Sequence, residues 1–322
     1  MSKKIIIVFG DPNSINSEII FKSWKKLSLN IKKKIYLISN FELLKSQFKR
    51  LKYNIKLKKV YNLSAKATKN ELKVIDIKLN FLNPFKVADK NASKFVINSL
   101  NLAHKLALLN KDVCGIINCP INKKLLKNKN TGVTEFLANK CKITNKSEVM
   151  LIYNEKFSVA PITTHIDIKN ISKRLSSNIL FKKIETINNW FGDKKNMRPS
   201  IGVLGLNPHN AELRAGSEEK KLIIPALKKL KRLNIKVDGP LVADTIFIKD
   251  YKKYNVIVGM YHDQVLIPFK TLFKFNAINI TLGLKYLRVS PDHGTASNLI
   301  GRKIANHKSL KKCIEFVNKF GK

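Results

Sequence analysis

Three of the six histidines share one setting in the sequence, because each of them closes a short apolar run. The runs end at His165, His209 and His262. In parallel α/β sheets the carboxyl ends of the strands surround a common crevice in which ligands bind. Imidazole is a frequent metal ligand, and three protein ligands leave coordination positions open for substrate oxygens. A single histidine in this setting is more often structural, but the repetition indicates one catalytic metal site.

A second group of polar and turn-forming residues lies between positions 261 and 302. Lys270 and Arg288 supply cationic donors suited to a phosphate or a carboxylate. Arg288 carries more information than any single lysine, because arginine is scarce in this lysine-rich chain. Gly283 and Gly294 permit turns or a close approach of the backbone. The density of such residues is typical of a binding site.

Several common motifs are absent from the sequence. There is no Gly-x-Gly-x-x-Gly and no Gly-x-x-x-x-Gly-Lys-Ser/Thr motif, so a nicotinamide cofactor, if used, is not held by a Rossmann fingerprint. The cysteines at positions 114, 119, 141 and 313 form no Cys-x-x-Cys pair, and we expect small core residues rather than a thiolate site. His104, within a predicted helix, and His307, in a basic segment, are expected to be structural or solvated.

The elements that must position these residues follow an alternating pattern. Short apolar runs alternate with longer amphipathic stretches, which predicts an α/β fold with a mostly parallel sheet. Strands are predicted at residues 4–9, 35–38, 113–118, 157–163, 200–206, 255–260 and 277–281. Helices are predicted at residues 17–29, 91–110, 171–190, 217–233 and 308–320. Residues 41–80, which contain neither Gly nor Pro, are predicted to be peripheral.

The length and the net charge of the chain limit the classes of protein to which it can belong. The chain has 322 residues, 44% of them apolar, which favours two lobes with ordinary hydrophobic cores. A formal net charge of +40 would ordinarily indicate a nucleic acid or an anionic membrane as partner. The lysines are scattered from end to end, however, which favours a general compositional bias. The N-terminal apolar run is too short for a signal peptide, and no stretch approaches the roughly 20 apolar residues of a membrane span. We therefore expect a cytoplasmic protein with no membrane partner and no specific nucleic acid partner.

A series of short motifs runs the length of the chain. The motifs are Gly10–Pro12 with Glu18, Pro120–Lys123, Thr134–Ala138, Thr163–His165, Gly205–His209 with Glu212, Gly239–Pro240 with Ala243–Thr245, Tyr261–Gln264, Asn279 with Thr281–Gly283, and Asp292–Ala296. In this order they resemble the motifs of the 4-hydroxythreonine-4-phosphate dehydrogenase family of pyridoxal phosphate biosynthesis. So many matches in one order argue against chance similarity.

The resemblance implies a fold and an assembly. The fold is two interleaved α/β/α lobes with mostly parallel sheets, like those of isopropylmalate and isocitrate dehydrogenases, and the active site lies in the cleft between the lobes. We expect residues 1–125 with 275–322 to form the first lobe, which carries the cofactor loop. Residues 126–274 are expected to form the second lobe, with the metal ligands and the dimer interface. The implied assembly is a homodimer whose metal site is shared between the subunits.

The resemblance also implies a reaction. This is the NAD-dependent oxidation of 4-phosphooxy-L-threonine to 2-amino-3-oxo-4-phosphooxybutanoate, which loses carbon dioxide to leave 3-amino-2-oxopropyl phosphate; NADP is an alternative cofactor. The implied ligands of one divalent ion (zinc, magnesium or cobalt) are His165, His209 and His262. The implied catalytic residues are Lys270, Asp263 and Asp244. The implied substrate contacts are Thr134, Lys270, Asn279 and Arg288.

One segment carries a second, more distant resemblance. Asp292–Ala296, continued by Ile304–Asn306, is similar to the adenosine-binding loop of isopropylmalate and isocitrate dehydrogenases. The cofactor contacts that this resemblance implies are His293, Gly294, Thr295, Ala296 and Asn306.

Several positions depart from the family pattern and leave alternatives open. Val133 stands where a histidine normally precedes the Thr-Glu-Phe-Leu-Ala stretch as a substrate contact. Residues 13–17 read Asn-Ser-Ile-Asn-Ser where Ala-Gly-Ile-Gly-Pro is usual, Asn210 replaces a small residue, and Val265 replaces a glycine. A dehydrogenase for a related sugar acid, such as threonate or erythronate 4-phosphate, is therefore one alternative. Two others are a basic nucleic-acid-binding protein without catalysis and a metal-free phosphotransfer or acyltransfer relative.

Overall fold

The computed structural model describes residues 3–65, 70–126, 132–143 and 146–321. The chain forms two compact units. Unit 1 comprises Met1–Phe136 and Lys285–Lys322, and unit 2 comprises Leu137–Leu284. The divisions therefore fall after residues 136 and 284, where the sequence predicted them after residues 125 and 274. The second shift arises because the strand at Ile278–Leu282 pairs with a strand of unit 2.

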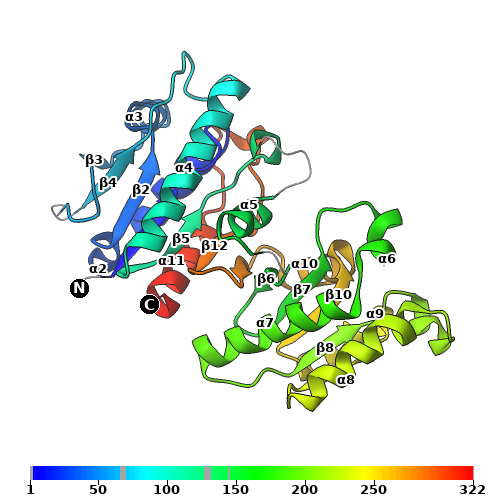
Figure 1. The fold of residues 1–322 in the computed structure, drawn as a ribbon. Helices are drawn as coiled ribbons and strands as arrows, with labels where there is room; N and C mark the ends of the chain where they lie inside the picture. Colours follow the sequence, from blue (N-terminus) through cyan, green and yellow to red (C-terminus); the bar gives the residue numbers. More distant parts are fainter. Residues whose placement is uncertain (1–2, 66–69, 127–131, 144–145, 322) are drawn as a thin grey trace. The chain divides into compact units, whose positions relative to one another are not determined.

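The described part of unit 1 contains six parallel strands in the order β3-β4-β2-β1-β5-β12 (Figure 1). Their bounds are β1 Lys4–Val8, β2 Ile35–Ser39, β3 Lys56–Val60, β4 Glu71–Asp76, β5 Val113–Asn118 and β12 Arg288–Pro291. Strands β2 and β5 are buried at every position, as apolar parallel strands are when helices cover both faces. The strand order reverses between β1 and β5, so the loops after these two strands meet at a topological switch point.

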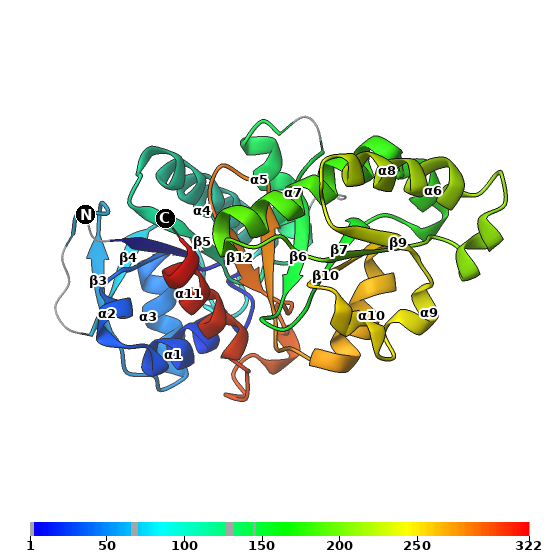
Figure 2. The ribbon, with the colours of Figure 1, turned by 90° about the horizontal axis from the view of Figure 1, so that it is seen from below.

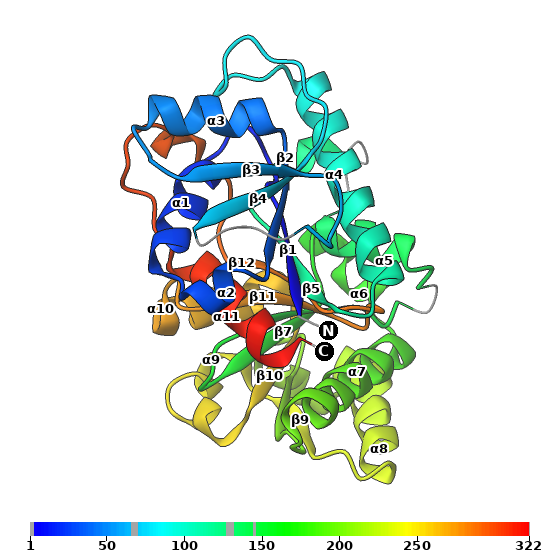
Figure 3. The ribbon, with the colours of Figure 1, turned by 90° about the vertical axis from the view of Figure 1, so that its left-hand side faces the viewer.

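Helices cover both faces of this sheet, which gives unit 1 three layers. Figure 2 shows α4 on one face and α1, α3 and α11 on the other. The bounds are α1 Asn16–Lys26, α3 Phe41–Arg50, α4 Asp89–Leu109 and α11 Lys308–Phe320. The buried residues of α4 recur at the three- and four-residue spacing of one helical face: Ala92, Phe95, Val96, Ser99, Leu100 and Ala103. Described residues near the two ends of the chain meet in unit 1, where Lys3 Nζ donates to the carbonyl of Gly321 at 3.0 Å (Figure 3).

The described part of unit 2 contains six strands in the order β11-β6-β7-β10-β8-β9. Strands β7, β10, β8 and β9 are parallel, whereas β6 pairs antiparallel with both β7 and β11. The bounds are β6 Val149–Tyr153, β7 Ser158–Thr163, β8 Ile201–Leu204, β9 Val237–Leu241, β10 Val256–Tyr261 and β11 Ile278–Leu282. The carboxyl ends of the four parallel strands therefore lie along one edge of this sheet.

Unit 2 is also layered. Helices α7 Ser177–Lys195 and α8 Ile224–Arg232 cover one face, and α10 His262–Phe273 packs on the other (Figure 2). The ring of Phe157 stacks on Phe269 and Phe273 of α10, with centroids 6.1 and 5.9 Å apart. The shorter helices of the chain are α2 Leu29–Lys32, α5 Val133–Lys140, α6 Ile171–Arg174 and α9 Ala243–Ile246. Single helical turns lie at η1 Lys123–Leu126, η2 Ile168–Asn170, η3 Pro208–Leu213, η4 Glu219–Ile223, η5 Asp250–Lys253 and η6 Ser297–Leu299.

The α/β prediction is confirmed, and every predicted strand coincides with an observed one within two residues. Two helix predictions were wrong in detail. In place of one helix at residues 171–190 there are α6 and α7, and α7 continues to Lys195, because Ser176 caps a new helix by accepting the N–H of Ile179 at 3.2 Å. Residues 217–233 begin with the π turn η4 before α8. Residues 41–80 are not merely peripheral, since they hold α3, β3 and β4, and β4 pairs with β2. Within the described ranges, no helix combines the length and hydropathy needed to cross a membrane.

Candidate functional site

The three candidate histidines of unit 2 follow three neighbouring parallel strands. His165 follows β7, His262 follows β10, and His209 follows β8, with β10 between the other two. The rings of His165 and His262 face one another at a tilt of 41°, with centroids 5.7 Å apart. The structure therefore brings these two imidazoles together, at the strand edge where ligands bind in α/β sheets.

The orientation of His262 suits metal binding. Its Nδ1 lies 2.6 Å from Oδ1 of Asp263, and because a carboxylate only accepts hydrogen bonds, Nδ1 carries the proton. Nε2 is then the nitrogen that can bind a metal ion, and the carboxylate holds the ring in one orientation. His262 is the first residue of α10, so the helix fixes its backbone while the carboxylate fixes its ring. The arrangement fits two ligands of a metal site that prefers nitrogen donors.

His209 has a different setting. It is exposed, and it opens a run of five residues, ending at Leu213, whose φ angles lie between 47° and 57°. This left-handed conformation costs roughly 1–2 kcal/mol per non-glycine residue, so the surrounding structure must hold it in place. Within the described residues, no three His, Cys, Asp or Glu side chains are grouped so that they could hold a metal ion. His165, His209 and His262 therefore do not form such a group within the described part of this chain, and the three-histidine metal site stays a prediction.

A buried carboxylate anchors the segment that leads to His209. Glu219 accepts the backbone N–H groups of Leu206 and Asn207 at 2.8 and 2.9 Å, and also the side-chain amide of Asn207. Its side chain is fully buried. Burial alone would raise the pKa of Glu219, but the hydrogen bonds from Asn207 and Leu206 outweigh burial and lower it. The carboxylate of Glu219 thus holds the segment before His209 in place by hydrogen bonds to Leu206 and Asn207, and we call this set of bonds the Glu219 clamp. Sequence reasoning did not identify Glu219.

Gln264 links the segments of His262 and His209. Its Oε1 accepts the N–H of Met260 at 2.7 Å, and its Nε2 donates to the carbonyl of Gly205 at 2.7 Å. Thr163 Oγ1 donates to the carbonyl of Met260 at 2.7 Å. These hydrogen bonds connect the carboxyl ends of β7, β10 and β8, and each of the three histidines follows one of these strands.

Two of the predicted substrate contacts meet in unit 1. Arg288 opens β12 and is buried, and its Nε donates to Oδ1 of Asn118 at 2.7 Å. Its Nη1 lies 3.4 Å from Oγ1 of Thr134, in α5. Burial lowers the pKa of Arg288 to about 10, which still leaves the guanidinium charged at neutral pH. A buried cation at a strand end is suited to a phosphate or carboxylate. Asn118, which ends the apolar run of β5, is a site residue that the sequence analysis missed.

The other predicted site residues of unit 2 lie on separate elements. Lys270 is in the last turn of α10, with its Nζ 5.3 Å from the centre of the Phe275 ring. Asn279 lies in β11, and its Oδ1 is buried and accepts no hydrogen bond from the described residues, so it could accept one from a ligand. Asp244 is exposed in the first turn of α9. The convergence of these residues on one substrate stays a prediction.

The predicted cofactor residues form a loop of unit 1 that contacts the segment after β1. The carbonyl of Thr295 accepts the N–H of Ile15 at 3.2 Å, and Ala296 has a left-handed φ of 45°. His293 Nδ1 lies 3.0 Å from the carbonyl of Gly294. A Cβ placed on Gly294 would meet no atom within 4 Å, so the space beside the backbone of Gly294 is open.

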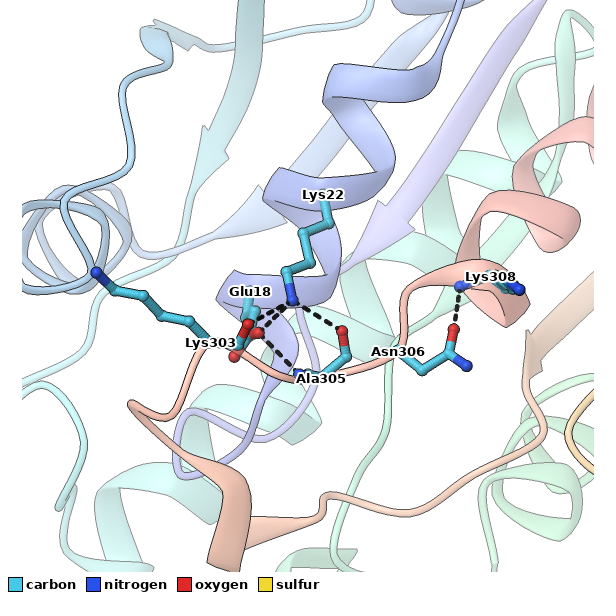
Figure 4. Close-up of polar contacts among 6 residues, drawn as sticks. All are labelled: Glu18, Lys22, Lys303, Ala305, Asn306 and Lys308. Atoms are coloured by element: carbon cyan, nitrogen blue, oxygen red, sulfur yellow. Dashed lines mark hydrogen bonds and ion pairs between the residues drawn. The ribbon is translucent and has the colours of Figure 1, made fainter.

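The second part of this loop is tied to α1 (Figure 4). Lys22 Nζ donates to Glu18 at 2.7 Å and to the carbonyls of Lys303 and Ala305 at 2.8 and 3.1 Å. Glu18 also accepts the N–H of Ala305 at 2.8 Å. Asn306 Oδ1 accepts the N–H of Lys308, the first residue of α11, at 2.9 Å. In this structure Asn306 therefore has a structural contact, and its role toward a cofactor stays a prediction.

The positions that depart from the family pattern are integrated into the fold. Asn13 bonds the backbone of Val87 through both ends of its amide, at 2.8 Å each. Asn210 Nδ2 donates to the carbonyl of Pro240 at 3.0 Å. Val265 is fully buried, and a Cβ on Gly259 would lie 2.5 Å from its Cγ1, so the glycine makes room for the valine.

The chain is similar to known proteins over nearly its whole length. The model of the family described as "Pyridoxal phosphate biosynthetic protein PdxA" matches residues 31–317. The 4-hydroxythreonine-4-phosphate dehydrogenases of Sulfurihydrogenibium sp. and Aquifex aeolicus are 34% and 36% identical to this chain, over 97% and 96% of it and over 96% and 95% of their own lengths. The D-threonate 4-phosphate dehydrogenase of Salmonella typhimurium is 31% identical, over 96% of both chains. The crystal structure of 4-hydroxythreonine-4-phosphate dehydrogenase from Klebsiella pneumoniae superimposes with a TM-score of 0.85 at 29% identity, covering all of both chains.

Proposed function

Because this chain belongs to the family of the pyridoxal phosphate biosynthetic protein PdxA, we propose that it oxidises 4-phosphooxy-L-threonine with NAD, or alternatively NADP. The family assignment favours this dehydrogenase function over a nucleic-acid-binding protein without catalysis. The observation that carries the proposal is the facing pair His165 and His262 at the ends of adjacent parallel strands, in a chain of this family. The reaction removes a hydride from C3 and a proton from its hydroxyl, and the 3-oxo acid then loses carbon dioxide as the bond between C1 and C2 breaks.

The residues of the chain have defined tasks in this proposal. His165, His209 and His262 hold one divalent ion, and Asp263 orients His262. When bound, a divalent ion would lower the pKa of the substrate hydroxyl and stabilise negative charge during loss of carbon dioxide. NAD would accept the hydride. Arg288 and Thr134 bind an anionic group of the substrate, and the buried oxygen of Asn279 accepts a hydrogen bond from it. Lys270 and Asp244 complete the catalytic set, with proton transfer at the hydroxyl as their task.

We propose further that the metal site is shared between two subunits of a homodimer. One chain supplies His165 and His262, and the partner supplies His209. Two features support this division: the first two rings face each other, and within the described residues no third ligand completes the group. The exposure of His209 also agrees with a role toward a second chain.

The reaction is tested by NADH formation. Purified protein, stripped of metal by a chelator, should reduce NAD in the presence of 4-phosphooxy-L-threonine only after a divalent ion is restored. Zinc, magnesium and cobalt are compared at equal concentration to identify the preferred ion. Equal rates with and without metal would exclude the proposed mechanism and favour the metal-free relative.

The shared site is tested by mixing inactive variants. A heterodimer of His209→Ala with His262→Ala contains one intact site if His209 is supplied across the interface. After subunit exchange in a 1:1 mixture, about half of the dimers are heterodimers and one of the two sites in each is whole, so we expect up to about a quarter of the wild-type activity to return. The matched control is a mixture of His165→Ala with His262→Ala, which should stay inactive because both residues come from one subunit. Recovery in the control, or none in the test pair, would refute this assignment.

A second candidate substrate is D-threonate 4-phosphate. Val133 stands where a histidine is usual in the family, and the relative from Salmonella typhimurium carries that substrate in its name. The two substrates differ in the group at C2, which is an amine in one and a hydroxyl in the other. The ratio of kcat/KM for the two compounds decides between them, and a higher value for D-threonate 4-phosphate would replace our assignment.

A further inference from the structure

Unit 1 contains a cavity of about 570 Å³ beside the predicted cofactor loop. Ser297 and Ile300, which lie between the first and second parts of that loop, form one part of the cavity wall. The opposite parts come from the segment after β1, from the end of α3 and from the residues that lead into α4. The cavity is therefore built by four segments that are distant in the sequence but belong to the same compact unit.

The residues that line the cavity include cationic, acidic and apolar side chains. Arg50 and Lys86 place two cationic side chains on the wall, and Asp89 places one carboxylate there. Phe85 and Ile300 supply apolar surface. Cationic groups bind phosphates, a carboxylate accepts hydrogen bonds from ribose hydroxyls, and apolar side chains cover a base. These are the three kinds of group that a nucleotide requires.

From this combination we propose that the cavity binds the phosphate-bearing part of a nucleotide, with Arg50 and Lys86 as its charge partners. This inference rests on the proposed function, which requires a nicotinamide dinucleotide. It goes beyond that function by assigning the phosphate contacts to two residues outside the motifs that carry the family resemblance. Asp89 adds a preference, because its charge would repel a phosphate on the ribose 2′ position and thus favours NAD over NADP.

The wall of the cavity is held in place before any ligand binds. Asn13, itself in the lining, joins the segment after β1 to Val87 by two hydrogen bonds of 2.8 Å. Asn83 Oδ1 accepts from Nη1 of Arg50 at 3.0 Å and from the N–H of Phe85 at 3.0 Å, which links α3 to the same segment. Such prior ordering reduces the entropy that binding must remove.

Binding of ADP and of adenosine to the full-length protein tests the proposal. Both ligands are titrated by calorimetry into wild type, Arg50→Gln and Lys86→Gln at one fixed salt concentration. We expect each variant to bind ADP about five- to tenfold more weakly, because one charge-assisted contact is lost, and to bind adenosine as wild type does. Lys90→Gln is the matched control, since it removes an equal charge from the neighbouring first turn of α4 without touching the cavity wall. Its affinity for ADP should change less than about twofold.

The outcomes separate this inference from the proposed function. If wild type binds ADP and oxidises its substrate while Arg50→Gln and Lys86→Gln bind ADP normally, the cavity assignment is wrong and the enzyme function stands. A parallel loss of adenosine affinity would also overturn it, because shape rather than phosphate charge would then be responsible. Failure of wild type to bind ADP would overturn both the assignment and the use of a nicotinamide dinucleotide. A repeat with 2′,5′-ADP tests Asp89, since Asp89→Asn should improve the binding of that ligand and wild-type binding should be weaker than for ADP.

Discussion

At the scale of single residues, the contact between His262 and Asp263 determines which ring nitrogen can bind a metal ion. The carboxylate of Asp263 is two-thirds exposed, yet it lies 2.6 Å from Nδ1 of His262. Such a partner selects the tautomer and restricts the ring to one orientation. Asp263 is thus a positioning residue in this structure, acting on the reaction through the histidine beside it.

Removal of the Asp263 charge should weaken metal binding more than folding. We expect Asp263→Asn to reduce the affinity for Zn²⁺ or Co²⁺ about 10- to 100-fold, because an uncharged amide orients the ring less strongly. Competition with a chromophoric chelator measures the affinity on metal-free protein. Asp250→Asn, which removes a carboxylate paired with Lys253, is the control and should bind metal as wild type does. Equal affinities for all three proteins would rule out the orienting role.

Single residues were predictable where a motif identified them. His165, His209, His262 and Arg288 stood out because each closes or opens an apolar run, or because its type is rare in the chain. Glu219 did not stand out, since it is one carboxylate in a charged stretch, and its partner Asn207 is 12 positions away. Only the folded chain shows that this side chain turns inward and is fully buried.

At the scale of elements, the important junction is between the end of β8 and the start of α8. Two side chains hold the residues that precede the left-handed turn at His209. Glu219 accepts the N–H of Leu206, and Gln264 donates to the carbonyl of Gly205 and so joins this segment to β10. A π turn, Glu219–Ile223, opens the helix at this point, and such turns are frequent at functional sites. The junction therefore holds a strained loop by buried charged hydrogen bonds rather than by regular structure.

Replacement of Glu219 should show how much the Glu219 clamp contributes to the free energy of unfolding. We expect Glu219→Gln to lower the free energy of unfolding of the protein by about 2 kcal/mol at pH 7, the range for hydrogen bonds to a charged group. The hydrogen bonds lower the pKa of Glu219, so its stabilisation is complete above the pKa of an unfolded glutamate and is lost as the pH falls through the folded value. The difference between wild type and variant should therefore shrink on acidification.

Urea denaturation at a series of pH values from neutral to acidic measures this difference. Glu155→Gln, at an exposed carboxylate, is the control and should unfold like wild type throughout. A constant difference across the series would mean that the carboxylate charge of Glu219 has no part in the clamp.

Several strands were predictable from the sequence because they are continuous apolar runs. Strands such as β1, β5 and β10 are runs of apolar residues, and their positions followed directly. Strand β3 was missed because it reads Lys-Leu-Lys-Lys-Val, with exposed lysines at the edge of its sheet. The η3 turn was missed because left-handed conformation in non-glycine residues follows from tertiary contacts, and local residue preferences argue against it.

At the scale of the whole molecule, the net charge of +40 sets a condition on stability. Charges of one sign repel each other in the compact state, and added salt screens this repulsion. We expect the Tm to rise by several degrees when sodium chloride is raised from about 0.02 M to about 0.5 M, where the screening length falls well below 10 Å. Thermal denaturation followed by circular dichroism measures the shift. A Tm that stays constant or falls would show that repulsion between the lysines does not limit stability.

The division of the chain into two units has a consequence for synthesis on the ribosome. Unit 2 is one continuous segment, Leu137–Leu284, whereas unit 1 needs β12 and α11, which follow unit 2 in the sequence. Strand β12 pairs with β5, so this flank of β5 stays uncovered on the growing polypeptide until translation has passed the whole of unit 2. Nascent domains fold as units once their residues have emerged. A product that terminates early, before Arg288, would thus retain every strand of unit 2 but leave β5 exposed as an edge that can pair with other chains.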